Sequence, residues 1–174
     1  HMACIYARLE KPEKAIRCLD ILTRSCVLKN LFTLHNDWRK MGLTLDGGES
    51  VPVQMDANMG IANAVQEMLL FVSDDFIKIL PACPERFKKG AVKNLHFMTG
   101  LISFKWDILA GYFVCNIASL RNTRLTIQLP KFFHRYAMNG HSIDGRTPGI
   151  ALKAGERLCI TAQTDKEEEE TNLA

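Results

Sequence analysis

The stretch LISFKWDI, residues 101–108, alternates between apolar and polar side chains and predicts a half-buried β-strand. One face carries Ile102, Phe104, Trp106 and Ile108, and the other carries Ser103, Lys105 and Asp107. Because Phe104 and Trp106 share a face with two isoleucines, we expect both rings in a hydrophobic core and not on a surface that binds a ligand.

The same period of two recurs on both sides of this stretch. The other candidate strands are FIKIL (76–80), VKNLHFM (92–98), YFVCNIA (112–118), RLTIQLP (124–130) and ERLCITA (156–162). Asn139-Gly140 is typical of the two-residue turn of a β-hairpin. Short strands at regular intervals predict an antiparallel β-sandwich, or a small barrel, over residues 74–163.

Residues 1–73 contain stretches with the period of amphipathic helices, separated by a long irregular segment from about Asn30 to Met55, so the predicted fold class is α+β. Pro12 and Glu13 suit a helix start, and the apolar stripe behind them is Ala15, Ile16, Leu19, Leu22 and Cys26. A second helix is expected over residues 58–72, with the stripe Ile61, Val65, Met68, Leu69 and Val72, and with Asn63, Gln66 and Glu67 facing solvent. Two helices cannot bury these stripes alone, so we expect them to pack on the β-domain, on further helices or on a second copy.

Composition and charge exclude several classes of function. The net charge of +3 is too small to predict nucleic-acid binding, and no such motif is present. No apolar run approaches the ~20 residues of a membrane helix, so we expect no membrane partner. Six cysteines without CxxC spacing argue against zinc and favour a reducing cytoplasmic location, and no cofactor motif is found. The acidic residues 164–174 are expected to be disordered.

Asp56 stands alone among uncharged residues in VPVQMDANMG, residues 51–60, just ahead of the second helix. A carboxylate there can act as an N-cap or first-turn acid, and Asn58 can also be an N-cap. Alternatively, Asp56 orients a polar side chain or a water in a sugar site. His35 is either an ordinary surface histidine or part of a ligand surface with Trp38 and Arg39, whose ring and guanidinium suit sugars and carboxylates.

Five motifs occur in a specific order over residues 3–163. They are Asn30-Leu31-Phe32 with His35, QMDANMG (54–60), EMLL (67–70), LPACP (80–84) and GAVK (90–93). Together they resemble the C-terminal part of glycoside hydrolase family 95, the inverting α-L-fucosidases. The N-terminal residues read as the middle of a helix, so we expect the chain to begin inside a larger protein.

The resemblance implies that residues 1–73 are the last helices of an (α/α)6 catalytic barrel and that residues 74–163 form its C-terminal β-sandwich domain. Asp56 matches the aspartate that polarises water-holding asparagines, and His35 matches a histidine that we take to contact the sugar. In the family the general acid and those asparagines lie upstream, so the fragment alone is expected to be inactive. The implied partner is a fucosylated oligosaccharide or glycoconjugate, and Asn58, Trp38 and Arg39 are the other candidate contacts.

This sequence also departs from the family. Ala57 and Met59 replace the usual Gly and Phe, and residues 36–54 intervene where the family has a short gap. The insertion can reshape the sugar pocket. Two alternatives therefore stay open: an α-L-galactosidase of the same family, and a non-catalytic β-sandwich module with a carbohydrate-binding or structural role.

Overall fold

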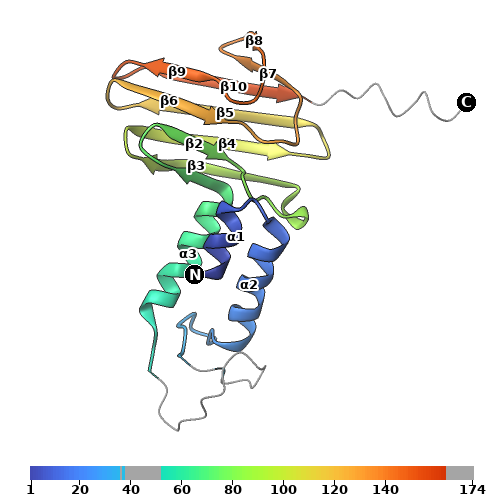
Figure 1. Ribbon diagram of the computed structural model, residues 1–174, viewed down its shortest axis with the longest axis vertical. Helices are drawn as coiled ribbons and strands as arrows, with labels where there is room; N and C mark the ends of the chain where they lie inside the picture. Colours follow the sequence, from blue (N-terminus) through green and yellow to red (C-terminus); the bar gives the residue numbers. More distant parts are fainter. Residues whose placement is uncertain (36, 38–51, 164–174) are drawn as a thin grey trace, which may run out of the picture. The chain divides into compact units, whose positions relative to one another are not determined.

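The computed structural model describes residues 1–35, 37 and 52–163 and shows an α+β protein, as predicted (Figure 1). Its residues form two compact units. The helical unit comprises His1–Phe71 and Pro81–Glu85, and the β-unit comprises Val72–Leu80 and the chain from Arg86 onward. We expected one boundary near residue 73, whereas the chain passes between the units after Phe71, after Leu80 and after Glu85.

The described part of the helical unit contains three α-helices. They are α1 (Met2–Arg8), α2 (Pro12–Ser25) and α3 (Met55–Leu69). Pro12 opens α2, and Glu13 lies in its first turn, as predicted. The predicted stripe of α2 is confirmed for Ala15, Ile16, Leu19 and Cys26, which are buried.

The apolar stripe that we predicted for α3 is correct only at Met68. Ile61, Val65 and Leu69 are half-exposed, and the buried face carries Ala64, Glu67 and Met68. The reason is the partner: α1 contacts α3 and presents the buried small residues Ala3 and Ala7. The small α1 residues leave room for the longer side chains of Glu67 and Met68 beside Ala64, so this face of α3 is the buried one. The helix also begins at Met55, three residues before the predicted start.

Two backbone N–H groups of the segment Pro81–Glu85 donate hydrogen bonds to helical residues of the same unit. The Ala82 N–H donates to the Met68 carbonyl oxygen at 3.2 Å, and the Glu85 N–H donates to Glu13 Oε1 at 2.8 Å. Glu13 therefore has a second partner besides the positive end of its own helix. A 3-10 turn, Glu85–Phe87, follows.

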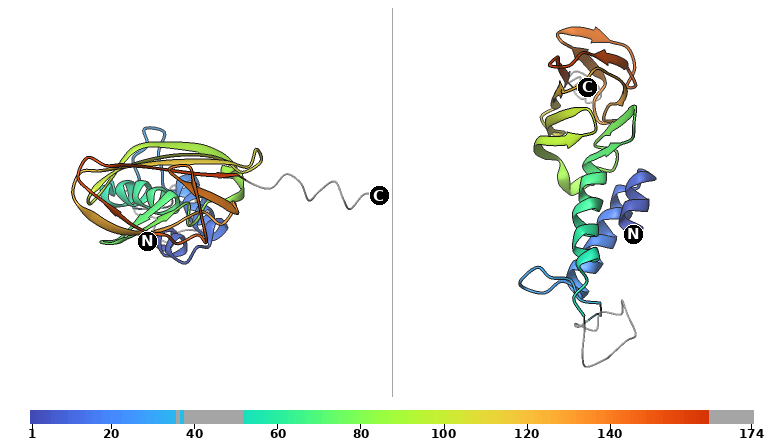
Figure 2. Two further views of the ribbon diagram at one scale, coloured as in Figure 1. Left: turned by 90° about the horizontal axis from the view of Figure 1, so that it is seen from above. Right: turned by 90° about the vertical axis from the view of Figure 1, so that its left-hand side faces the viewer.

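The strands of the described chain form two sheets. The larger has the order β3 (Lys89–Phe97), β4 (Gly100–Asp107), β5 (Tyr112–Ser119), β10 (Arg157–Gln163), β7 (Arg135–Met138) and β8 (His141–Ile143), with antiparallel pairings. The smaller has the order β1 (Leu70–Val72), β2 (Phe76–Ile79), β6 (Thr123–Gln128) and β9 (Gly149–Leu152). The two layers are compatible with a β-sandwich (Figure 2), although β2 and β6 are parallel.

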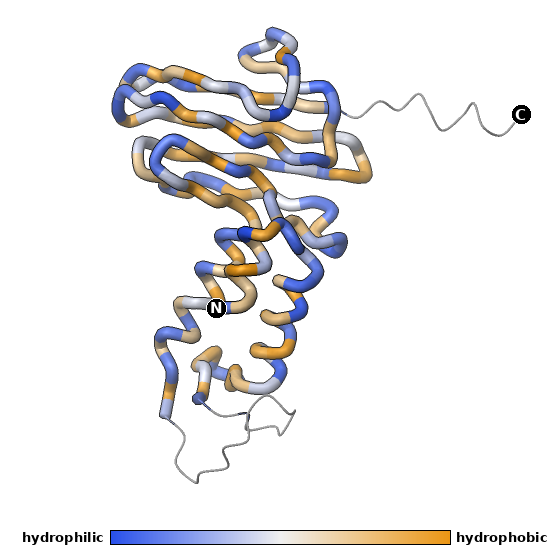
Figure 3. Tube along the Cα trace, in the orientation of Figure 1, coloured by the Kyte–Doolittle hydropathy of each residue, from blue (hydrophilic) through white to orange (hydrophobic). Residues whose placement is uncertain are grey.

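The core of the β-unit follows the predicted alternation, which is visible as changing hydropathy along the strands (Figure 3). In the β4–β5 pair, Phe104 lies opposite Cys115 and Trp106 lies opposite Phe113. Phe104 and Trp106 are 2% and 4% exposed, so the prediction that both rings are core is confirmed. The Phe113 ring is 5.6 Å from the Phe133 ring, centroid to centroid.

At two positions of the β-unit the local geometry explains which residue type is present. Asn139 and Gly140 have φ of 48° and 84° and join β7 to β8, which confirms the predicted hairpin. Gly90 lies opposite Trp106, and a Cβ on Gly90 would come within 2.5 Å of the indole ring. The indole N–H donates to the Phe87 carbonyl oxygen at 2.8 Å, which holds the ring in place.

Candidate functional site

Two segments that are distant in the sequence pair immediately before α3. Leu34 and Val53 form an antiparallel bridge. The His35 N–H donates to the Pro52 carbonyl oxygen at 3.0 Å, and the Gln54 N–H donates to the Thr33 carbonyl oxygen at 2.7 Å. This short ladder carries residues 33–35 to the N-terminal end of the helix, where Asp56 lies. We call these residues, 33–35 and 52–58, the α3 entry.

The side chain of Asn58 links α3 to the backbone of the preceding segment. Its Nδ2 donates to the Leu31 carbonyl oxygen at 2.6 Å, and its Oδ1 accepts from the Thr33 N–H at 2.9 Å. The amide thus satisfies two backbone groups 25 and 27 residues earlier in the chain. Asn58 is not the N-cap, because Gln54 holds that position.

Asp56 is an exposed residue in the first turn of α3. This position agrees with its reading as a first-turn acid, next to backbone N–H groups that have no acceptor within the helix. Among residues 1–35, 37 and 52–163, no hydrogen bond of the Asp56 side chain is found. The carboxylate is therefore open to a water or to another polar group.

His35 lies on the same surface through its contact with Gln54. The Gln54 Nε2 amide and His35 Nδ1 are hydrogen-bonded. An amide nitrogen can only donate, so Nδ1 is the acceptor in this contact and Nε2 is left for another partner. The ring is exposed, and its Nε2–H can donate to a ligand oxygen.

The α3 entry therefore brings together three of the five predicted site residues: His35, Asp56 and Asn58. The other two, Trp38 and Arg39, lie outside the described residues. Sequence reasoning missed Gln54, which links His35 to the start of the helix. The sequence did contain a signal for Gln54, namely its position two residues before Asp56 in VPVQMDANMG.

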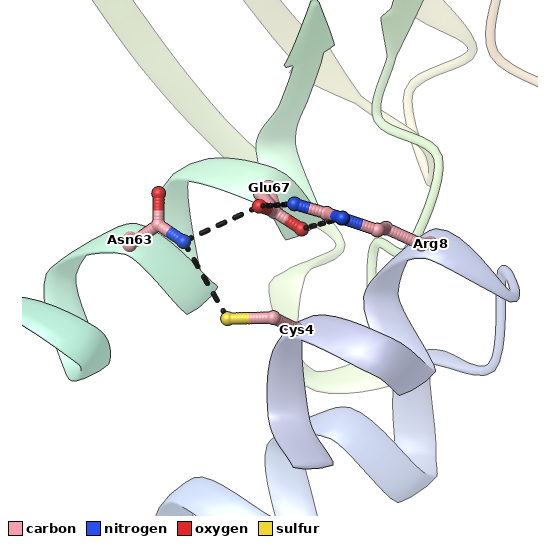
Figure 4. A network of polar contacts seen from close by, with 4 residues as sticks. All are labelled: Cys4, Arg8, Asn63 and Glu67. Carbon is pink, nitrogen blue, oxygen red and sulfur yellow. Dashed lines mark hydrogen bonds and ion pairs between the residues drawn. The ribbon is translucent and has the colours of Figure 1, made fainter. Parts of the chain in front are cut away.

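A second polar cluster lies between α1 and α3 (Figure 4). Arg8 donates from Nε and Nη2 to the two carboxylate oxygens of Glu67, at 2.8 and 2.7 Å. Asn63 Nδ2 donates to Glu67 Oε1 at 3.2 Å and to Cys4 Sγ at 3.5 Å. The prediction that Glu67 faces solvent was wrong, because the residue is 8% exposed.

The environment of Glu67 keeps it ionised. Its hydrogen bonds with Arg8 lower the pKa of the carboxyl group below the ordinary value, and they outweigh the opposite effect of desolvation. The Arg8 guanidinium also lies 5.8 Å from the centre of the Phe71 ring. Both oxygens of this carboxylate accept hydrogen bonds from protein donors, so the cluster has the character of a structural ion pair.

Comparison with models of known protein families gives no match for this chain, and neither does comparison with curated protein sequences. Within the described part of the chain, no three His, Cys, Asp or Glu side chains gather as a metal site would require. The same residues contain no helix long and apolar enough to cross a membrane. The α3 entry is thus defined by its own chemistry: an exposed carboxylate, an imidazole N–H and two amides.

Proposed function

We propose that this sequence is the C-terminal part of an inverting α-L-fucosidase similar to glycoside hydrolase family 95, with Asp56 as a catalytic auxiliary. The motif order of the sequence supports the family. The pairing of residues 33–35 with residues 52–54 carries the proposal, because it puts His35 and Asp56 at one end of α3 despite the intervening insertion.

The proposed chemistry divides the work between this chain and the rest of the barrel. An inverting hydrolase needs a general acid on one face of the sugar and an activated water on the other. Asp56 would polarise the asparagines that hold this water, and its lack of a hydrogen bond within the described chain leaves it able to do so. The acid and those asparagines would come from the preceding part of the barrel.

The other site residues take different roles in this proposal. His35 would donate its Nε2–H to a sugar hydroxyl, with Gln54 fixing the ring. Asn58 would be a positioning residue, because its amide already holds the backbone of Leu31 and Thr33. Trp38 and Arg39 stay predicted sugar contacts.

Exposed apolar residues on the helical unit support the proposed barrel. Met2, Ile5 and Leu9 follow at spacings of three and four along α1 and its C-cap, and they are 43–58% exposed. Such a face suits packing against further helices of an (α/α)6 barrel. In an isolated fragment it would favour self-association through the same face. We also propose a reducing, cytoplasmic compartment, because all six cysteines are free thiols.

The test is the hydrolysis of aryl α-L-fucoside by the full-length hydrolase. Asp56→Asn should lower kcat by at least about 100-fold, the usual contribution of acid–base machinery. The matched control is Asp74→Asn, an exposed acid outside the α3 entry, which should change kcat by less than about twofold.

Two other outcomes would overturn parts of the proposal. A loss below about tenfold for Asp56→Asn would reduce this residue to a first-turn acid. Turnover by the 174-residue chain alone would show that the acid and base lie within it. Aryl α-L-galactoside, assayed in parallel, decides between the two sugars, which differ at one carbon.

A further inference from the structure

An open hollow of about 510 Å³ lies on the outward face of the larger sheet. The outward residues are those that alternate with the core positions of β4, β5 and β10. A row of them crosses the sheet, because Ser103 pairs with Asn116 and Asn116 pairs with Cys159. A second row runs beside it through Leu101, Ala118 and Arg157.

Two asparagines extend the first row at its ends. Asn94 lies at a bulge of β3 with φ of 51°, where the register shifts between Val92 and Leu95. Its N–H donates to Ser103 Oγ at 2.9 Å. Asn139, from the β7–β8 turn, accepts the Cys159 N–H on its Oδ1 at 2.9 Å. The bulge and the turn thus hold both amides in the lining of the hollow.

Among the described residues, the polar groups of this lining that have no protein partner are mostly donors. Asn94 and Asn139 use their Oδ1 atoms within the sheet, at Ser103 and Cys159, which leaves their Nδ2 groups to donate outward. Within residues 1–35, 37 and 52–163, the side chains of Asn116 and Arg157 have no hydrogen-bond partner. The lining residues include one cation, Arg157, and no carboxylate.

From this donor-rich lining we propose that the hollow binds an acidic saccharide of one or two rings. The Arg157 guanidinium would hold the carboxylate with two parallel N–H···O bonds. The asparagine amides would donate to ring hydroxyl oxygens, and Leu101 with Ala118 would contact the C–H face of the sugar. The volume fits a ligand of this size, whereas a free phosphate would fill only a small part of it.

This site does not depend on the proposed hydrolase, since every residue that lines it belongs to the β-unit. The two proposals can therefore fail separately. The α3 entry would act on a neutral fucoside, and the hollow would recognise charge at a place where no reaction occurs.

The experiment is an NMR titration of the ¹⁵N-labelled 174-residue chain with digalacturonate. Galactobiose of the same linkage is the control ligand without charge, and inorganic phosphate is the control ligand with charge but no sugar. We expect millimolar or tighter binding of digalacturonate, with shifts at the Asn116 amide and the Arg157 Nε–H. Galactobiose and phosphate should each bind at least tenfold more weakly, because each offers only part of the contacts.

Three variants locate the site. Arg157→Ala should weaken digalacturonate binding at least tenfold, and Asn116→Ala about three- to tenfold, as expected for a charge-assisted and a neutral hydrogen bond. Lys105→Ala removes the same charge from the same face outside the lining, and should change the affinity less than about twofold. Unchanged ¹⁵N spectra elsewhere in each variant show that its fold is intact.

Each remaining outcome would overturn the inference. Absence of binding at 10 mM digalacturonate, about tenfold above a millimolar Kd, would show that the site does not exist. Equal affinity for galactobiose would show that charge does not contribute to recognition. Equal affinity for phosphate would show that the sugar ring does not contribute. Equal weakening by Arg157→Ala and Lys105→Ala would reduce the effect to general electrostatic attraction.

Discussion

Arg8 on α1 donates two hydrogen bonds to the Glu67 carboxylate on α3. The Arg8 side chain is 60% exposed, whereas that of Glu67 is only 10% exposed. The acid is therefore the buried partner, and the arginine covers it from the solvent side. Because the two residues lie 59 positions apart in the sequence, the pair fixes how the two helices meet.

Removing the arginine should be costly for this reason. Arg8→Ala leaves a nearly buried carboxylate without its main donors, and should lower the free energy of unfolding by about 1–3 kcal/mol. Urea denaturation followed by circular dichroism measures the change. Arg17→Ala, an exposed arginine of α2, is the control and should stay within about 0.5 kcal/mol. Equal effects of the two variants would contradict a specific role of the pair.

The same pair predicts a dependence of stability on pH. Because Arg8 lowers the folded-state pKa of Glu67, the carboxylate contributes stability above its unfolded pKa of about 4.3, and this contribution is lost as the pH falls through the lower folded value. Glu67→Gln should therefore be less stable than the natural chain at pH 7, and the difference should shrink below about pH 4. A difference that is constant from pH 7 to pH 3 would argue against this assignment.

Asn58 offers a local test of the α3 entry. Asn58→Ala removes the acceptor of the Thr33 N–H, so hydrogen exchange of this amide should become at least about tenfold faster, the equivalent of 1.4 kcal/mol. The amides in the centre of β4 and β5 serve as internal references and should keep their rates. Asn63→Ala, five residues further along α3, should leave the exchange of Thr33 unchanged.

Gly90 is predicted to tolerate no side chain. Gly90→Ala puts a Cβ against the Trp106 ring, which is already held by its bond to Phe87, and should destabilise the chain by about 1–3 kcal/mol. Gly149→Ala is the matched control, since its Cβ meets nothing within 4 Å. Thermal unfolding should show a lower Tm for the first variant only. A Tm that is equal in both variants would mean that the indole moves at little cost.

The sequence predicted the strands well because a period of two leaves little choice of face. Phe104 and Trp106 point inward as expected, since any shift by one residue would expose both rings. The Asn139-Gly140 turn was predictable for a similar reason, because few residues adopt a positive φ.

The helices and the site were less predictable. A period of 3.6 shows which residues of α3 share a face, but which face is buried depends on the neighbour. The face of α3 that meets the small residues of α1 carries Ala64, Glu67 and Met68. The ion pair with Arg8 offsets the cost of burying the Glu67 carboxylate. The ladder between Leu34 and Val53 was equally invisible, since no local pattern encodes pairing across such an interval.

The segment Pro81–Glu85 has a consequence for how this sequence can be inherited or recombined. Neither unit is encoded by one continuous stretch of sequence, because these five residues of the helical unit follow β2 in the chain. A fusion junction placed near residue 73 would deprive Met68 and Glu13 of the backbone donors that they now have. Exchange of modules between such proteins should therefore be selected to move both units as one block, because a cut after Glu85 would separate β2 from its partner β6.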